Sequence, residues 1–85
     1  MAPDVLALMA LAHIAGDEAL GPRFLALTGM DSSDLRARAA EPDVLAAVLD
    51  FLTGHEADMI STAAAIGTTP ARLAAAARAL GTPWE

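Results

Sequence analysis

The chain has 85 residues, of which 55% are hydrophobic, and a formal net charge of −6 from eleven carboxylates and five arginines. It contains no cysteine, which excludes disulfides, thiolate catalysis and cysteine-based zinc sites. The negative charge disfavours nucleic acid and anionic membranes as partners, because their phosphate groups repel it. This length corresponds to one helical domain spanning residues 1–85, with room for one hydrophobic core.

Helix start and stop signals divide the chain into short segments. Proline, which suits a first helical turn, stands at positions 3, 22, 42 and 70, and glycine, which favours a helix end, stands at positions 16, 29, 54, 67 and 81. Asp31 is predicted to cap the helix that follows it, and Asp34 completes an approximate capping box. The sequence shows no alternation of polar and apolar residues typical of strands. It therefore predicts helices over residues 3–15, 22–28, 32–40, 42–53, 56–66 and 70–80.

The first predicted helix carries apolar side chains around most of its circumference, namely Val5, Leu6, Leu8, Met9, Leu11 and Ile14. A helix that is apolar all round is normally buried all round. We therefore expect an all-α fold, a compact irregular or orthogonal bundle of five to six short helices with the apolar first helix at its centre. The alternative is that this helix lies in a subunit interface. On either account, Leu8→Asp is expected to unfold the chain or to dissociate an oligomer.

The same apolar stretch bears on localisation. It is too short to span a bilayer as a helix, and it follows Asp4 rather than the basic residues of a signal peptide. We therefore expect a cytoplasmic protein without a membrane partner.

The spacing of apolar residues also predicts which face of each later helix turns inward. These faces are Leu20, Phe24 and Leu27 in the second helix, Val44, Leu45, Val48, Leu49 and Leu52 in the fourth, Met59, Ile60, Ala63 and Ile66 in the fifth, and Leu73, Ala76, Ala77 and Leu80 in the sixth.

The last two helices resemble a DNA-binding helix-turn-helix corner, which needs polar and basic side chains on the outer face of its second helix. That face here is mostly alanine with two arginines and offers no Asn, Gln, Ser or Lys to read a base. A smooth alanine face suits contact with a partner helix, although alanine is also a good helix former on an exposed surface. The predicted partner-contact residues are Ala71, Arg72, Ala75, Arg78 and Trp84.

Catalytic and metal-binding residues are sparse. His13, His55, Glu56 and Asp58 are the only metal-ligating set to consider, but His13 is distant in sequence, and the two acids suit a helix N-terminus without any ion. The hydroxyl side chains have explanations as helix caps or helix-surface residues, and no glycine-rich phosphate loop is present. We expect no cofactor, no metal and no enzymatic activity.

Three sequence blocks carry a resemblance to a known family. They are FLALTG at residues 24–29, DLR at 34–36 and VLAAVLDFL at 44–52. With the apolar helix before them, they resemble a bacterial family known only as domain of unknown function 3572. The resemblance implies a small, stand-alone helical protein with no assigned activity and therefore no functional residues to transfer.

Together, these features favour a non-catalytic protein-interaction or regulatory module that binds a protein partner or forms a homo-oligomer. The alternative is a helix-turn-helix-like nucleic-acid-binding protein.

Overall fold

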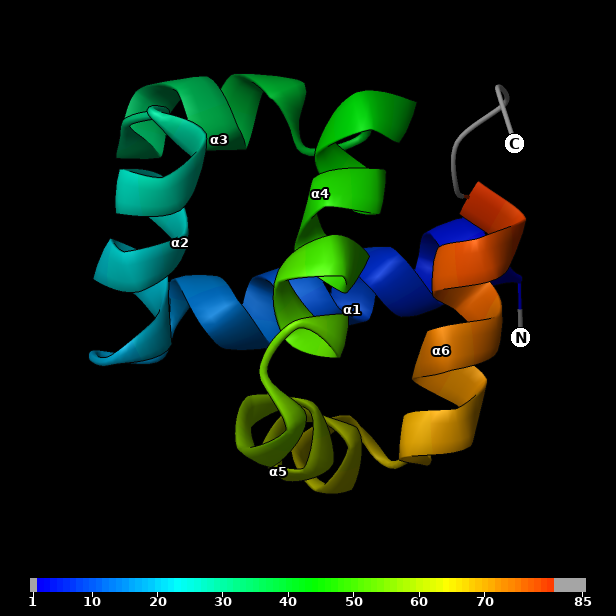
Figure 1. Ribbon diagram of the computed structural model, residues 1–85. Coiled ribbons are helices and arrows are strands. Elements are labelled where there is room, and N and C mark those ends of the chain that lie inside the picture. Colours follow the sequence, from blue (N-terminus) through cyan, green and yellow to red (C-terminus); the bar gives the residue numbers. More distant parts are fainter. Residues whose placement is uncertain (1, 81–85) are drawn as a thin grey trace.

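The computed structural model describes residues 2–80, which form helices joined by short turns and contain no strand. The helices are α1 (Pro3–Ala15), α2 (Leu20–Thr28), α3 (Ser32–Arg38), α4 (Pro42–Thr53), α5 (Glu56–Ile66) and α6 (Pro70–Leu80) (Figure 1). The all-α prediction is therefore confirmed. The predicted bounds of the first, fourth, fifth and sixth helices are also confirmed.

Two predicted helix ends are wrong. The second helix begins at Leu20 rather than Pro22 because the side chain of Asp17 accepts hydrogen bonds from the backbone N–H groups of Ala19 and Leu20, both at 2.8 Å. Pro22 then stands in the first helical turn, where its missing N–H costs nothing. The third helix ends at Arg38 because the chain must turn there to reach the extended residue before Pro42.

The turns between helices use the caps that the sequence indicates. Asp31 accepts a hydrogen bond from the backbone N–H of Asp34 at 2.8 Å, and the Asp34 side chain reaches back to the N–H of Asp31, so the predicted capping box is present. Gly29 and Gly67 end α2 and α5 in the left-handed conformation, with φ of 75° and 78°. Glycine adopts this conformation with the least strain.

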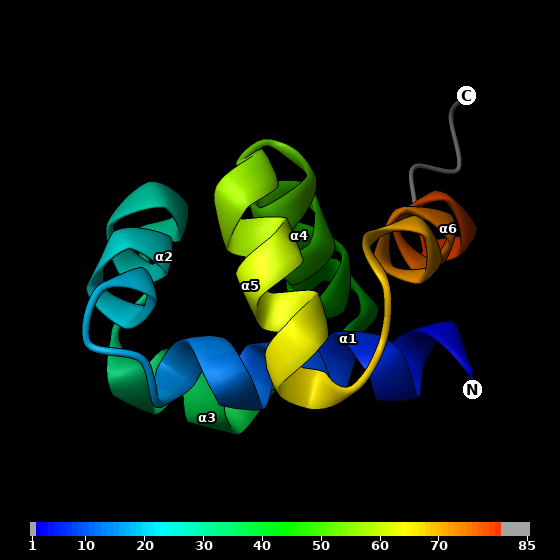
Figure 2. The same ribbon diagram turned by 90° about the horizontal axis from the view of Figure 1, so that it is seen from below.

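Helix α1 joins the bundle together, because it contacts α2, α4, α5 and α6, and it runs along one side of these four helices (Figure 2). Helix α4 crosses over it and supplies the largest share of the core. Fully buried residues of several helices meet there, including Ile14, Phe24, Val48, Leu49, Leu52 and Leu73. Helix α3 differs from the others because Leu35 is its single buried side chain.

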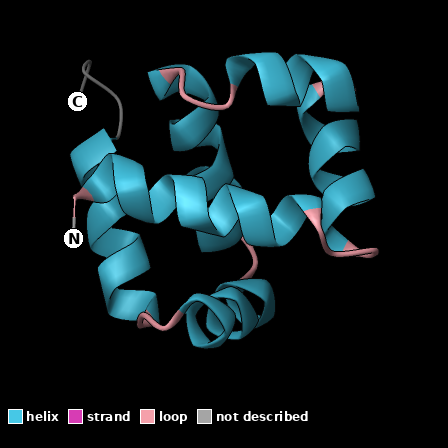
Figure 3. Cartoon of the chain, turned by 180° about the vertical axis from the view of Figure 1, so that it is seen from behind, coloured by secondary structure: helices cyan, strands magenta, loops and turns pink. Residues whose placement is uncertain are grey.

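The expectation that α1 is buried all round is wrong. Its inner face is buried, but Val5 is 46% exposed and Leu8 is 45% exposed. Figure 3 shows why, since α1 runs across the near side of the bundle in that view, in front of α4. A fold of six short helices leaves one side of α1 uncovered. The prediction that Leu8→Asp unfolds the chain therefore lacks a basis within the monomer.

The inward faces of α2 and α5 are also partly mispredicted. Leu27 is 64% exposed and Ile60 is 51% exposed, whereas Phe51 and Thr62 are buried without having been predicted so. The predicted inner faces of α4 and α6 are confirmed, with Leu73 and Ala76 buried and Leu80 packed against the core.

Within residues 2–80, no single helix is long and apolar enough to cross a membrane. Only α1 and α2 taken together reach the necessary length and composition, and their axes are bent by 112°.

Candidate functional site

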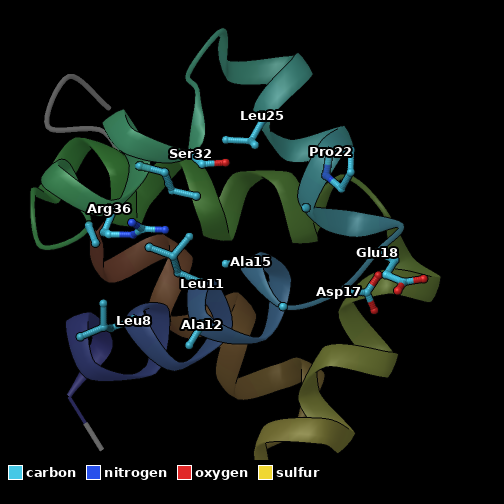
Figure 4. Close-up of a pocket in the computed structure, with 14 residues that line it drawn as sticks. Leu8, Leu11, Ala12, Ala15, Asp17, Glu18, Pro22, Leu25, Ser32 and Arg36 are labelled. Carbon is cyan, nitrogen blue, oxygen red and sulfur yellow. The ribbon is translucent and has the colours of Figure 1, made fainter.

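A groove of about 570 Å³ lies between α1, α2 and α3 on the described surface. We call it the α1–α2–α3 groove. Its lining consists of Leu8, Leu11, Ala12, Ala15, Gly16, Asp17, Glu18, Gly21, Pro22, Leu25, Ser32, Leu35, Arg36 and Ala39. Figure 4 shows these side chains around the open space. Its volume lies in the range of known small-molecule and cofactor sites.

The floor of the groove is the uncovered side of α1. Leu8, Ala12 and Ala15 follow one another along that side, and Val5 continues the line beyond the groove. All four are exposed, and their spacing of three and four residues places them on one helix face. The side chains of the two alanines are too short to fill the space above them, which creates the hollow, and Leu8 lies at its edge. The floor is therefore an apolar stripe, bulky at one end and small at the other.

The walls follow from the sharp turn after α1. The 112° bend between α1 and α2 raises α2 from the end of α1, and Gly21 permits their close approach. A Cβ atom at Gly21 would lie 3.2 Å from the carbonyl oxygen of Ile14. The left-handed Gly29 then turns the chain into α3, which contributes Leu35 to the lining of the groove. The turns after α1 and α2 therefore shape the groove, and it is not a gap left by a small side chain in the core.

The two ends of the groove carry opposite charges. Arg36 lies beside Leu8 and Leu11 at one end, while Asp17 and Glu18 lie at the other (Figure 4). The backbone N–H groups of Leu20 and Ala19 donate to the Asp17 carboxylate and hold its pKa below the ordinary value, because these hydrogen bonds favour the ionised form. The groove is therefore an apolar channel with a positive end and a negative end.

Arg36 differs from two other arginines of the chain. Arg23 pairs with Asp58, and Arg38 donates from Nε to Oε1 of Glu41 at 2.9 Å. Arg36 makes no ion pair or side-chain hydrogen bond with any residue from 2 to 80. Its guanidinium group is available to an incoming anion, because it is exposed at the groove edge.

The comparison with known families agrees with the sequence blocks. The sequence model of a family described as "Protein of unknown function (DUF3572)" matches residues 1–83. The chain belongs to this family. No curated protein and no solved structure shows a significant match to this chain.

A second, shallower hollow of about 340 Å³ on the DUF3572 fold lies beside Phe24, Leu27 and Phe51. The rings of Phe24 and Phe51 pack edge to face with centroids 5.4 Å apart, and the guanidinium of Arg23 lies 5.5 Å from the Phe51 ring centre. The Arg23–Asp58 pair closes this cluster by joining α2 to α5. We interpret the cluster as structural, because its charged groups pair with each other.

The predicted partner-contact residues on α6 are exposed. Ala71, Arg72, Ala75 and Arg78 all lie on the surface, and Trp84 lies outside the described residues. Neither of the two hollows includes a residue of α6. Contact through α6 stays a prediction. Sequence reasoning missed the α1–α2–α3 groove. The apolar side chains around most of the circumference of α1 were a signal for an exposed apolar side, but not for the hollow beside it.

The candidate metal ligands are not brought together. His13 lies on α1 and His55 precedes α5, and across residues 2–80 no three His, Asp or Glu side chains gather closely enough to hold an ion.

Proposed function

We propose that this DUF3572 protein is a non-catalytic protein-interaction module that binds its partner through the α1–α2–α3 groove. The observation that carries the proposal is the exposed apolar stripe of α1 beside a hollow. Leu8 is 45% exposed at the edge of that hollow and Val5 is 46% exposed next to it. Contiguous apolar surface of this kind on a small protein is typical of a contact site.

The shape of the groove supports a protein partner. The groove is partly open to solvent and is lined by one side of α1, and helices commonly dock into open apolar grooves with their apolar side. Burying Leu8 and Val5 under a partner would remove apolar surface from water, which favours association. The short side chains of Ala12 and Ala15 let a partner backbone come close to α1.

The chemistry of the lining supports binding rather than catalysis. The polar side chains that line the groove belong to Asp17, Glu18, Ser32 and Arg36. An activated serine needs a base within hydrogen-bond reach, and the lining includes no histidine. Asp17 is engaged by two backbone N–H groups. These side chains suit recognition of charged groups on a partner.

The experiment compares two substitutions of exposed leucines. Leu8→Gln changes the groove, and Leu27→Gln is the matched control, since Leu27 is exposed on α2 outside the groove. Each tagged variant is expressed in the source cells, cross-linked and analysed by quantitative mass spectrometry, and its mass in solution is measured by light scattering.

We expect wild type and Leu27→Gln to form cross-links to one or more proteins, or to form a dimer of the chain. We expect Leu8→Gln to lose these cross-links or this dimer. Identical cross-linked proteins and identical mass for wild type and Leu8→Gln would refute the proposed function.

A further inference from the structure

The charged ends of the α1–α2–α3 groove indicate which kind of partner fits it. Building on the proposed function, we propose that the occupant is an amphipathic helix of another protein that lies parallel to α1. The acidic first turn of this helix lies at Arg36, and its basic last turn lies at Asp17 and Glu18. Three features of the groove support this assignment: its spacing, its length and its polarity.

The spacing of the stripe matches a helix partner. Val5, Leu8, Ala12 and Ala15 are separated by three, four and three residues, which is the seam along which two helices pack side by side. Small residues on one helix allow axes to approach to about 8 Å. Large apolar side chains of the partner would then fill the hollow over Ala12 and Ala15, while Leu8 would pack between successive turns of the partner.

The length of the stripe sets the size of the occupant. Residues 5 to 15 span about 15 Å of helix, so a partner of roughly three to four helical turns covers the stripe from one charged end to the other. A helix of this length presents apolar residues at positions i, i+3 or i+4, and i+7.

The polarity follows from the charges. Acids are favoured in the first turn of a helix and basic residues in the last turn, because they offset the helix dipole. A helix with that charge order meets Arg36 with its acids and Asp17 and Glu18 with its bases only when it runs parallel to α1. The full charge of each side chain outweighs the half charge of the helix terminus beside it.

A second copy of this chain fits less well. Two-fold pairing of α1 helices is either antiparallel or parallel. The antiparallel pair brings Arg36 of one copy toward Asp17 and Glu18 of the other. It also brings Asp4 to the same acids, and the parallel pair places each of these charged groups beside its own copy. Both arrangements therefore bring like charges together, whereas a helix of another protein can carry basic residues alone at the acidic end, and each copy carries a net charge of −6.

The probes are two synthetic peptides of about fourteen residues with the same stripe of leucines. The dipolar peptide has Glu in its first turn and Lys in its last, and the neutral peptide has Gln at those positions. Titration calorimetry measures both against the full chain. We expect the dipolar peptide to bind about three- to tenfold more tightly at low salt, and this advantage to disappear at about 0.5 M salt. Leu8→Gln should weaken both peptides roughly tenfold, and Leu27→Gln should leave them unchanged.

The orientation test uses a nitroxide label on the last residue of the dipolar peptide. With the wild-type chain, the label should broaden the amide signals around Glu18 and leave those around Arg36 sharp. In the double variant Glu18→Lys and Arg36→Glu the first substitution neutralises the acidic end, where Asp17 remains, and the second makes the Arg36 end negative, so the broadening should move to the Arg36 end. The matched control is Glu56→Lys and Arg72→Glu, which exchanges two exposed charges outside the groove and should leave the label where it was.

Several outcomes would overturn the inference. The first is that the amide signals broaden at the same end of the groove in wild type and in the groove double variant. The second is that the two peptides bind with equal affinity at low salt, and the third is that Leu8→Gln leaves the peptide affinities unchanged. If the wild-type chain is a dimer and Leu8→Gln dissociates it, the occupant of the groove is a second copy. If decanoate displaces the peptide, the occupant is an amphiphilic small molecule. If Leu8→Gln abolishes cross-linking to a partner protein while the peptides show none of the expected binding, the proposed function stands, and only the assignment of a helix as the occupant is wrong.

Discussion

The strongest test of this structure is the contrast between two leucines of one helix. Leu6 and Leu8 are two residues apart on α1, but Leu6 is 5% exposed and Leu8 is 45% exposed. Leu→Ala at a buried site removes the transfer free energy and leaves a cavity, which together cost about 2–5 kcal/mol. At Leu8 roughly half of the side chain is in water, no closed cavity forms, and the cost should be about 1 kcal/mol or less.

The total stability of a chain of this length is on the order of 4–13 kcal/mol, so Leu6→Ala should remove a large part of it. The assay is urea unfolding followed by circular dichroism, with the change in midpoint multiplied by the common slope. Both variants introduce the same residue, so helix propensity cancels. Equal losses at the two positions, independent of protein concentration, would refute the assignment of Leu8 to the surface. A loss at Leu8 that grows with protein concentration would instead show that a second copy buries it.

Three further predictions concern turns and caps. Because hydrogen bonds lower the pKa of Asp17 in the folded state, its contribution is present above the ordinary pKa and lost as pH falls through the lowered one. The urea midpoint should therefore fall less between about pH 6 and about pH 2.5 in Asp17→Asn than in wild type or in the control Asp50→Asn. Asp31→Ala should cost about 1 kcal/mol, seen as roughly fivefold faster hydrogen exchange of α3 amides. Gly67→Ala, at a φ of 78°, should cost about 1–2 kcal/mol of unfolding free energy, whereas Gly16→Ala, where a Cβ meets ordinary contacts, should be neutral or stabilising.

Helix existence was predictable from the sequence because the signals are local. Prolines, glycines and Asp31 act on the backbone within one turn, so the start of α4 and the capping box of α3 required no knowledge of tertiary structure. The start of α2 was missed because Asp17 acts as an acceptor three residues before Leu20, and Gly21 and Pro22 gave a competing signal.

Helix faces were less predictable because burial depends on neighbours. Leu27 has the right spacing to face inward with Phe24, but α2 stands at the edge of the bundle and only one side of it meets α4. On α5 the packed line passes through Thr62 and Ala63, which leaves Ile60 outside. Periodicity finds an apolar stripe but does not say how many neighbours will cover it.

The groove itself lay beyond sequence reasoning. Its lining comes from three helices and its shape depends on the angle between α1 and α2, which no local pattern specifies. The interpretation of α6 as the contact surface rested on an outer face with few charges. That face is exposed but carries alanine and arginine, whereas the exposed large apolar side chains of residues 2–80 lie elsewhere, at Val5, Leu8, Leu27 and Ile60.

The apolar side chains on the two sides of α1 therefore need two different physical explanations. Its inner side, with Ile14 fully buried, is needed by the core and contacts four other helices. Its outer side, with Leu8 and Val5 nearly half in water, contributes little to the stability of the monomer. A side chain that does little for the fold is free to serve binding, so Leu8 can be changed to test contact without unfolding the domain, while Leu6 cannot. The same separation would let a chain of 85 residues accommodate both a core and the proposed contact surface, because one helix would supply both, on opposite sides.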